Sequence, residues 1–414
     1  MIDFKTTPAP TSCYFILTEN CNLRCTYCFE RNTREVDKYM SKETAFKTID
    51  YLFKNAQLRK DAKQCESTSD SQANSCNCRP ISVGITFFGG EPLLCPELMI
   101  DILHYGQAKE EETGIPVTFS LITNGTLYNE KIEAFLEEWY KIKKVVDIQL
   151  SIDGPPHIQN LNRPCANPCV RSSDLAEQAI SKYKDFFMKH KIPQQKLHIH
   201  CVISKASLPH IFDSHLYFTE KLNILYKFAW VIEDDWDEND IAILDAETTK
   251  IMHHMEKYTM NKERFPFKTF DRCSGCASGR TLICVDTNGD IYPCHRFFFY
   301  SAKRADMKYG NIYNEQPINL ELYQKFTSID ESKMSDKPCQ VCVAVNYEYT
   351  NDLHKRIHDY DEKFMVILNK HYYDFLNILE RKTTVKTMER MVHEMKKLSD
   401  RLLLIEEQLK ITNS

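Results

Sequence analysis

Apolar residues in the first 240 positions change period in a regular way, from alternation over short runs to spacings of three and four. Alternating β-branched or aromatic runs predict strands, and spacings of three and four predict amphipathic helices. The predicted strands are Tyr14–Leu17, Val83–Phe88, Val117–Ile122, Val146–Ile152, Leu197–Ile203 and Tyr226–Ile232. The predicted helices lie near residues 42–55, 96–111, 129–143, 174–189 and 208–222. This succession indicates an α/β fold with a parallel sheet, arranged as a partial (β/α)6 barrel.

The same pattern divides the chain into four parts. Residues 1–240 hold the barrel, and residues 241–271 are expected to form a connecting helical segment. Residues 272–350 are rich in cysteine and turn residues and predict a small second domain, whereas residues 351–414 are expected to be C-terminal helices. Inside the barrel, residues 59–80 are polar and lack periodicity, which predicts an exposed loop or a disordered insertion.

An apolar seam with steps of three and four runs along the C-terminal part of the chain. Its members are Met388, Met391, Met395, Leu398, Leu402, Ile405 and Leu409. A heptad-like seam is typical of a helix that packs on another helix. Packing on the chain's own domain is the favoured interpretation, and a dimer or a partner helix is the alternative.

The composition excludes several classes of protein. The 414 residues carry a net charge of −5 with both signs mixed, so the basic surface of a nucleic-acid-binding protein is not expected. The first ten residues hold no apolar signal segment, and no stretch approaches the roughly 20 apolar residues of a membrane helix. We therefore expect a soluble, cytoplasmic protein, in which 17 cysteines indicate metal binding or catalysis rather than disulfides.

Three of these cysteines, Cys21, Cys25 and Cys28, have the spacing C-x-x-x-C-x-x-C directly after the first predicted strand. Three thiolates do not complete a structural zinc site, which is usually closed by four protein ligands. They can hold three irons of a [4Fe–4S] cluster and leave the fourth iron open to an external ligand. Active sites of barrels lie on the loops after the strands, so the position favours a catalytic cluster.

This motif, with Tyr27 before its last cysteine, resembles that of the radical S-adenosylmethionine (SAM) superfamily. The resemblance implies a [4Fe–4S] cluster on the three cysteines, with SAM as the ligand of the open iron. It also implies that the reduced cluster cleaves SAM to a 5′-deoxyadenosyl radical, which modifies the substrate. An external electron donor, such as a flavodoxin or ferredoxin, is implied as a partner.

Further motifs of the superfamily follow the next three predicted strands. In "FFGGEP" the two glycines allow close approach of a backbone, and the glutamate offers a carboxylate to a cationic amine. "TNG", "QLSIDGP" and "NLNRP" come later in the chain. By resemblance, the residues that contact SAM are Tyr27, Gly89, Gly90, Glu91, Asn124, Ser151, Asp153 and Arg163. An ordinary tight turn is the alternative for the glycines, and a surface arginine is the alternative for Arg163.

A second group of cysteines lies beyond residue 272. Cys276, Cys294 and the C-x-x-C pair of Cys339 and Cys342 supply four ligands, and Cys273 is an alternative to Cys276. Taken alone, four cysteines are also the number that a structural zinc site requires.

The segments "GDIYPCHRF" and "YGNIYN" resemble the opening of the auxiliary-cluster domains called SPASM and Twitch. "DTNGDIYPC" predicts a hairpin turn at Asn288 and Gly289 before Cys294. A full SPASM domain continues with further cysteines, whereas no cysteine follows Cys342. The count therefore implies one auxiliary cluster, as in the shorter Twitch arrangement, and two [4Fe–4S] clusters in total.

Enzymes with such domains mostly act on ribosomally made peptides or on sulfatases. The resemblance therefore implies a peptide or protein substrate, with ribosomal peptide maturation by thioether or carbon–carbon crosslinking as the first hypothesis. Anaerobic sulfatase maturation, which accompanies two auxiliary clusters in the family, and radical dehydrogenation of a small molecule are the alternatives. A metal-binding module without activity is disfavoured, because four cofactor motifs follow four strands.

No residue is an evident catalytic acid, base or hydrogen donor. Cys201, in the middle of the fifth predicted strand, could donate hydrogen in a barrel interior, although a buried cysteine is more often a small apolar residue. Asp235 and Asp237 follow the sixth strand, where a solvated acidic loop is the simpler interpretation. Ordinary thiols are the simpler interpretation for cysteines outside both groups. These include Cys65, Cys76, Cys78, Cys165, Cys169 and Cys284.

Overall fold

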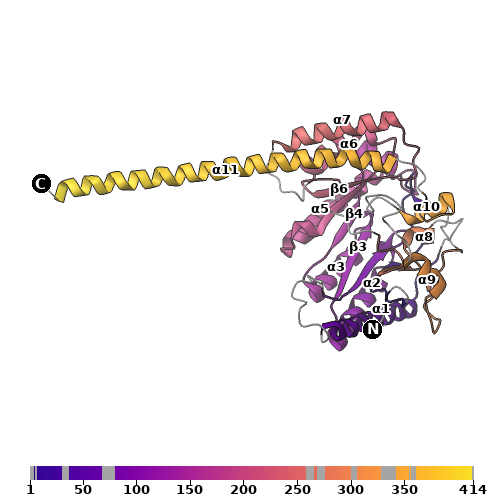
Figure 1. Cartoon of the computed structure of the whole chain (residues 1–414). Coiled ribbons are helices and arrows are strands. Elements are labelled where there is room, and N and C mark those ends of the chain that lie inside the picture. Colours follow the sequence, from indigo (N-terminus) through magenta and orange to yellow (C-terminus); the bar gives the residue numbers. More distant parts are fainter. Residues whose placement is uncertain are drawn as a thin grey trace.

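The computed structural model describes residues 4, 7–29, 37–67, 80–257, 265–267, 276–299, 305–327, 342–353, 355 and 360–412. Helices surround a central sheet, and one long helix extends away from this body (Figure 1). The strands are β1 (Ser12–Ile16), β2 (Val83–Phe88), β3 (Val117–Thr123), β4 (Ile148–Ser151), β5 (Leu197–Ile203), β6 (Leu225–Trp230), β7 (Leu282–Val285), β8 (Asp290–Tyr292) and β9 (Gly310–Asn311). The helices are α1 (Lys42–Ser67), α2 (Pro96–Thr113), α3 (Glu130–Lys143), α4 (Pro156–Asn162), α5 (Ser172–Lys189), α6 (Ile211–Leu216), α7 (Glu238–Met255), α8 (His295–Phe299), α9 (Leu320–Thr327), α10 (Val343–Thr350) and α11 (Tyr360–Thr412). Short helical turns are η2 (Pro92–Leu94), η3 (Gln194–Lys196), η4 (Leu208–His210) and η5 (Tyr217–Lys221).

Six parallel strands form the larger part of the sheet, in the order β6-β5-β4-β3-β2-β1. A helical segment lies between each strand and the next, so sequential strands are also neighbours in space. This arrangement confirms the predicted α/β fold and the alternation of strands with helices. The carboxyl ends of parallel strands meet at one edge, which brings the loops after β1 to β5 together.

The sheet continues from β1 into the cysteine-rich segment. β7 pairs with β1 in parallel, with Ser12 opposite Leu282, and β8 and β9 follow in antiparallel order. The turn between β7 and β8 contains Asn288 and Gly289, and Gly289 has a φ of 81°. The hairpin predicted at this pair is therefore confirmed. The cysteine-rich segment is held on the barrel by backbone pairing.

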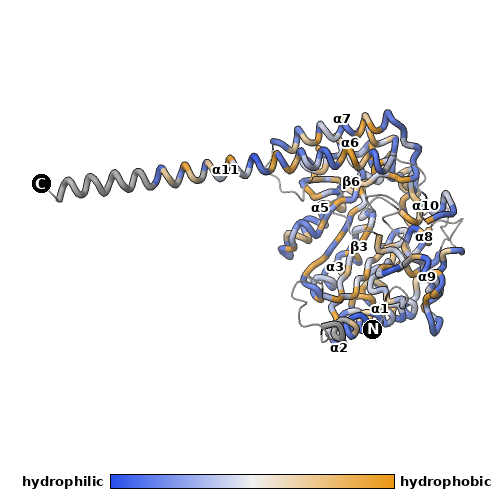
Figure 2. The backbone as a smooth tube through the Cα atoms, viewed as in Figure 1, coloured by the Kyte–Doolittle hydropathy of each residue, from blue (hydrophilic) through white to orange (hydrophobic). Residues whose placement is uncertain are grey.

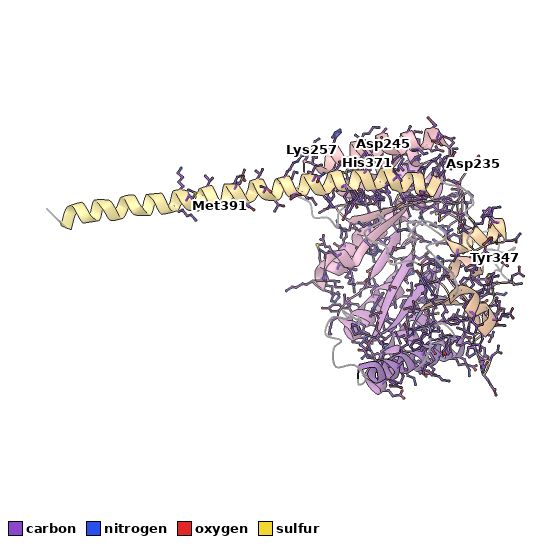
Figure 3. The ribbon with its side chains drawn as sticks, in the orientation of Figure 1. Asp235, Asp245, Lys257, Tyr347, His371 and Met391 are labelled. Atoms are coloured by element: carbon purple, nitrogen blue, oxygen red, sulfur yellow. The ribbon has the colours of Figure 1, made fainter. Side chains whose placement is uncertain are left out.

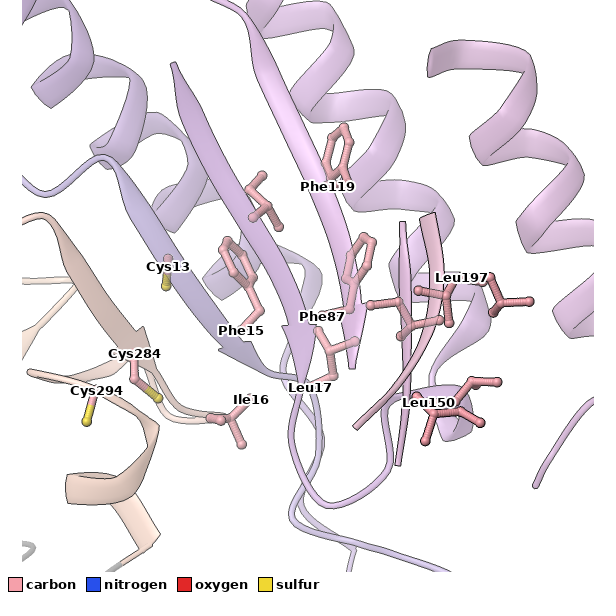
Figure 4. Packing of buried hydrophobic residues seen from close by; sticks show 14 of the residues in the cluster. Cys13, Phe15, Ile16, Leu17, Phe87, Phe119, Leu150, Leu197, Cys284 and Cys294 are labelled. Carbon is pink, nitrogen blue, oxygen red and sulfur yellow. The ribbon is translucent and has the colours of Figure 1, made fainter. Parts of the chain in front are cut away.

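Alternation along the strands separates two faces of the sheet. Phe15, Phe87 and Phe119, on three neighbouring strands, are buried in the apolar core (Figure 4). Residues in between face the other side, where the hydroxyl groups of Thr86 and Ser120 lie 2.9 Å apart in a hydrogen bond. The strands thus have an apolar face that packs on the helices and a second face that also carries polar groups.

Helix α1 extends well beyond the predicted end at residue 55. Its last residues are rich in lysine, glutamine, glutamate and alanine, which favour a helix even without an apolar stripe. Arg59 anchors this part, because its Nε donates to the carbonyl oxygen of Ala9 at 2.6 Å. The predicted loop is therefore wrong for residues 59–67, including Cys65. Residues 68–79, with Cys76 and Cys78, lie outside the described residues.

The first part of α11 packs on α7. Phe364, Leu368 and Phe375 of α11 are buried. The Nε2 atom of His371 lies 2.7 Å from Oδ1 of Asp245 on α7, and both residues are labelled in Figure 3. Helix α7 in turn occupies much of the segment that the sequence predicted to be a helical connection.

The second part of α11 leaves the body, and its described side chains from residue 383 to residue 397 are exposed (Figure 1). Met388, Met391 and Met395 are between 61% and 67% exposed. The expectation that the seam packs on its own domain is therefore wrong for these residues, because the apolar residues that do pack lie upstream of residue 380. Among the described helices, none is both long enough and apolar enough to cross a membrane.

Candidate active site

Cys21, Cys25 and Cys28 lie on the loop after β1, at the carboxyl edge of the sheet, and all three are partly exposed. Polar groups from other loops point at their sulfur atoms. The Nδ2 atom of Asn124 lies 3.8 Å from Sγ of Cys21, and a guanidinium nitrogen of Arg163 lies 3.9 Å from Sγ of Cys25. Such donors stabilise thiolates, which are the form that binds iron. The three thiols therefore fit a [4Fe–4S] cluster with one iron left open.

Gly89 and Gly90 bring the loop after β2 against the start of the cysteine loop. The N–H of Gly90 donates to the carbonyl oxygen of Thr18 at 2.8 Å, and the N–H of Glu91 donates to that of Asn20 at 2.7 Å. A Cβ atom on Gly90 would lie 2.2 Å from the oxygen of Asn20, and Gly89 has a φ of 132°. The predicted close approach is confirmed, and the backbone approached is the chain's own. Contact of these glycines with SAM stays a prediction.

The carboxylate of Glu91 is buried and joins the ends of β2 and β3. Its Oε1 accepts from the hydroxyl of Thr123 at 2.5 Å and from the N–H of Leu93 at 3.0 Å, and its Oε2 accepts from the N–H of Asn124 at 2.9 Å. Burial raises the pKa of Glu91 to about 7, although these hydrogen bonds oppose the rise. Glu91 therefore has a structural role beside its predicted contact with the amino group of SAM.

Exchange of Glu91 for Gln is expected to change how stability depends on pH. Burial raises the pKa of the native carboxyl from 4.5 to about 7, so between these values the native state keeps a proton that the unfolded state releases. The contribution of Glu91 to stability is therefore complete below the lower value and is lost by the upper one. We expect the free energy of unfolding of the wild type to fall by about 3 kcal/mol relative to Glu91→Gln across this window. Chemical unfolding of both proteins on either side of it measures the difference.

Glu97→Gln is the control for this experiment, because Glu97 is an exposed carboxylate that pairs with Lys131 on the surface. An equal slope in wild type and Glu91→Gln would contradict the assignment. If Glu91 also binds the SAM ammonium, Glu91→Gln weakens SAM binding by roughly ten- to a hundredfold at fixed pH. Anaerobic calorimetry tests that separate expectation.

Asp153, on the loop after β4, binds both the loop after β1 and strand β5. Its Oδ2 accepts from the hydroxyl of Tyr27 at 2.5 Å, and its Oδ1 accepts from Arg163 at 3.0 Å and from the N–H of Val202 at 2.9 Å. The guanidinium of Arg163 also lies over the ring of Tyr27, 5.4 Å from its centroid. Arg163 is buried, so the alternative of a surface arginine is wrong. These three predicted residues meet beside Cys25, whereas Ser151 ends β4 at partial exposure.

Asp153→Asn is expected to lower the free energy of unfolding by about 3–5 kcal/mol, because it leaves the buried guanidinium of Arg163 without its negative partner. Denaturant unfolding measured by circular dichroism tests this. Asp174→Asn is the matched control, since Asp174 pairs with Arg171 at an exposed site. Similar small losses in both variants would show that Asp153 does not compensate a buried charge.

The second group of cysteines gathers near β1. Burial and then Cys342 raise the pKa of Cys294, which places the two thiols within electrostatic range of each other. Burial, followed by the thiols of Cys294, Cys284 and Cys276, raises the pKa of Tyr14 on β1 to about 12. Figure 4 shows Cys284 and Cys294 on adjacent segments beside the core. Three predicted ligands are therefore brought together, and Cys284, which was not a predicted ligand, lies with them.

The other two candidates of this group, Cys273 and Cys339, lie outside the described residues. The choice between Cys273 and Cys276 therefore stays open, as does the role of the C-x-x-C pair as a unit. Cys284 could have been placed in the group from the predicted hairpin, because it lies opposite Tyr292, two residues before Cys294.

An aromatic cluster connects the two cysteine groups. α8 starts directly after Cys294, and the ring of its first residue, His295, lies 5.9 Å from the ring of Phe29, which follows the last cysteine of the first group. The guanidinium of Arg296 lies 5.0 Å from the centre of the same ring. Burial, and then Arg296, lowers the pKa of His295 to about 3, so its imidazole is neutral at physiological pH. Sequence reasoning missed this contact, and the run "HRFFF" after Cys294 was its only signal.

Comparison with known proteins agrees with this geometry. Residues 11–175 match a family model described as a 4Fe-4S single cluster domain, which is of the radical SAM type. The matched region is thus of the radical SAM type, and the relatives of the chain are radical SAM enzymes. The matched region contains the cysteine loop, the glycine pair and the Asp153–Arg163 pair.

Relatives of this chain include maturation enzymes. The cysteine-type anaerobic sulfatase-maturating enzyme of Clostridium perfringens (strain 13) is 25% identical over 348 residues, which cover 78% of this chain and 83% of that protein. The antilisterial bacteriocin subtilosin biosynthesis protein AlbA of Bacillus subtilis (strain 168) is 24% identical over 342 residues, covering 80% of this chain and 64% of that protein. A solved structure, anSMEcpe with bound AdoMet, has a TM-score of 0.62 at 20% identity and covers 90% of this chain and 98% of that one.

The remaining candidate residues lie outside the cysteine groups. Cys201 lies on the helix-covered face of β5, where its thiol donates to the carbonyl oxygen of Asp153 at 3.1 Å and burial raises its pKa. It therefore does not face the barrel interior, where a hydrogen donor is needed. Asp237 caps α7 and pairs with Lys205, and Asp235 is exposed. Both aspartates thus fit the simpler interpretation of a solvated loop.

Proposed function

We propose that this chain is a radical SAM enzyme that matures a ribosomally made peptide by forming a thioether or a carbon–carbon crosslink. The observation that carries the proposal is the second cysteine group, which β7 holds against β1 and which α8 connects to the first cysteine loop. A peptide substrate is supported by what two similar proteins act in or bind. One takes part in subtilosin biosynthesis, and a structural neighbour at a TM-score of 0.60 was solved with bound AdoMet and the Cp18Cys peptide.

We propose two clusters and SAM as the cofactors. Cys21, Cys25 and Cys28 would hold the first [4Fe–4S] cluster, with Asn124 and Arg163 donating to two of the sulfur atoms. When bound, this cluster and SAM supply a radical that removes a hydrogen atom from the substrate. A reduced flavodoxin or ferredoxin is the proposed electron donor. The chain's own contribution is to fix the cysteine loop, and the buried Asp153 does so through three hydrogen bonds.

The auxiliary cluster is proposed on Cys276, Cys294, Cys339 and Cys342. Its place beside the first loop suits a group that accepts an electron from the substrate or binds it. The ring of His295 lies beside those of Tyr14 and Phe29, and all three side chains are partly exposed.

Sulfatase maturation is the second candidate, because the Clostridium perfringens relative matches 78% of this chain. The cysteine count argues against it. No cysteine follows Cys342, whereas two auxiliary clusters would require further ligands.

Product analysis under anaerobic conditions separates these candidates. The reconstituted enzyme is incubated with SAM, reduced flavodoxin and either a precursor peptide encoded beside its gene or a cysteine-type sulfatase peptide. Crosslinking yields a product lighter by two hydrogen atoms, whereas sulfatase maturation yields an aldehyde that a hydrazine traps. An aldehyde from the sulfatase peptide, with no change in the precursor, would reject crosslinking.

A further inference from the structure

The projecting half of α11 exposes a line of apolar side chains. Val385, Met388, Met391 and Met395 are exposed by 52%, 62%, 61% and 67% of their surfaces. Figure 2 shows apolar positions recurring along this helix after it has left the body, and Figure 3 labels Met391 on it. The Lys382 side chain donates to the carbonyl oxygen of Glu256, and the described side chains from residue 383 to residue 397 are exposed. Within the described part of the chain, nothing covers the line beyond that point.

The helix is too long to be explained as a frayed end. It continues to Thr412, so about 30 residues and roughly 45 Å of helix lie beyond Lys382. Isolated helices in water owe little stability to propensity, and most helices in proteins are stabilised by packing of an apolar face. A helix of this length with an exposed apolar line therefore calls for a partner.

The sequence extends the line with the spacing of a coiled coil. After Met395 come Leu398, Leu402, Ile405 and Leu409, so apolar residues occupy successive a and d positions over three heptads from Met388. The intervening described positions are polar on the opposite side, with Glu389, His393, Lys396 and Lys397. Apolar a and d positions form the seam by which a helix packs against one similar helix. Val392, at an e position, is apolar and exposed as well.

We propose that the seam from Met388 to Leu409 pairs with the same seam of a second copy of this chain, forming a coiled-coil dimer. A seam that pairs with itself is isologous, which is the commonest form of interface in soluble homo-oligomers. The charges at the e and g positions, which flank the seam, are compatible with this pairing. In a parallel pair, the g and e positions that face each other combine Glu394 with Ser399 and Arg401 with Glu406, so no like charges meet. This inference does not depend on the proposed peptide substrate.

The test measures the mass of the full chain in solution by light scattering after anaerobic size-exclusion chromatography. We expect twice the 48.6 kDa mass of one chain at micromolar concentration. Met391→Lys places a charge at a d position and is expected to raise the dissociation constant by about a hundredfold or more, giving a monomer. His393→Lys adds the same side chain at the opposite f position and is expected to remain a dimer.

Iron content and SAM binding keep the test interpretable, because both depend on residues at the sheet and should be unchanged in Met391→Lys. A wild-type monomer, or a dimer that persists in Met391→Lys, would overturn the proposal. Equal dissociation of Met391→Lys and His393→Lys would do so as well, since it would assign the effect to charge rather than to the seam.

Discussion

Replacement of Cys21, Cys25 and Cys28 together by Ala is expected to abolish SAM cleavage and to remove about half of the iron. The three thiols are the proposed ligands of the first cluster. Their loss leaves Asn124 and Arg163 with no sulfur to contact, while β7 and β8 remain paired. Iron analysis and the yield of 5′-deoxyadenosine, both measured anaerobically, test the expectation.

Cys169→Ala is the control for this variant. Cys169 is exposed on a segment that lies beside the cysteine loop, where Leu23 and Cys165 form a backbone bridge. The control should keep the full iron content, about eight per chain if both clusters form. SAM cleavage that survives in the triple variant would show that the loop does not hold the catalytic cluster.

Replacement of Cys294 and Cys342 by Ala is expected to uncouple the reaction, so that SAM is cleaved but no modified peptide forms. The two thiols lie within electrostatic range of each other in the second group, while the first cysteine loop has its own hydrogen bonds to Asp153 and Asn124. If the second group were only a structural metal site, its loss should unfold the segment, because such sites supply folding energy outright. Deoxyadenosine yield, product mass and proteolytic resistance in one sample separate the two cases. A folded variant that makes full product would contradict a catalytic role.

Cys284→Ser refines this experiment. Cys284 is buried beside the predicted ligands but is not one of the four. Full iron content in this variant supports the predicted ligand set, whereas loss of about half would place Cys284 among the ligands.

The barrel could be predicted because each of its strands has a recognisable pattern of residues in its own short stretch of sequence. In Val83–Phe88, for example, Val83, Ile85 and Phe87 are buried, and the residues between them are partly buried. The large apolar residues at these alternate positions are visible in the sequence. The pairing of β7 with β1 could not be predicted, since it joins segments about 270 residues apart and no local period encodes such a contact. The prediction of a loop at residues 59–67 was wrong for a different reason. They form a helix through intrinsic propensity and an anchoring arginine rather than through an apolar stripe.

In the candidate active site, too, features set by local sequence could be predicted, and contacts between distant segments could not. The cysteine loop and the glycine pair could be predicted from the sequence, because the function of each motif requires particular residue types a few positions apart. The burial of Arg163 depends on Asp153 and Tyr27, which reach it from two other loops, so a single stretch of sequence does not reveal it. The seam of α11 could be predicted as a helix from its spacing, but its exposure depends on where the packing on the body stops, after Leu379.

The parallel pairing of β1 with β7 has a consequence for how the protein can be dissected. β1 carries the sequence Ser-Cys-Tyr-Phe-Ile and is an interior strand, bonded on one side to β2 and on the other to β7. Removal of the segment that contains β7 would turn β1 into an open, apolar edge, which is a template for aggregation. The catalytic half is therefore not a module that can be cut out and assayed alone. The auxiliary segment therefore also covers the edge of the barrel sheet, independently of any cluster that it holds.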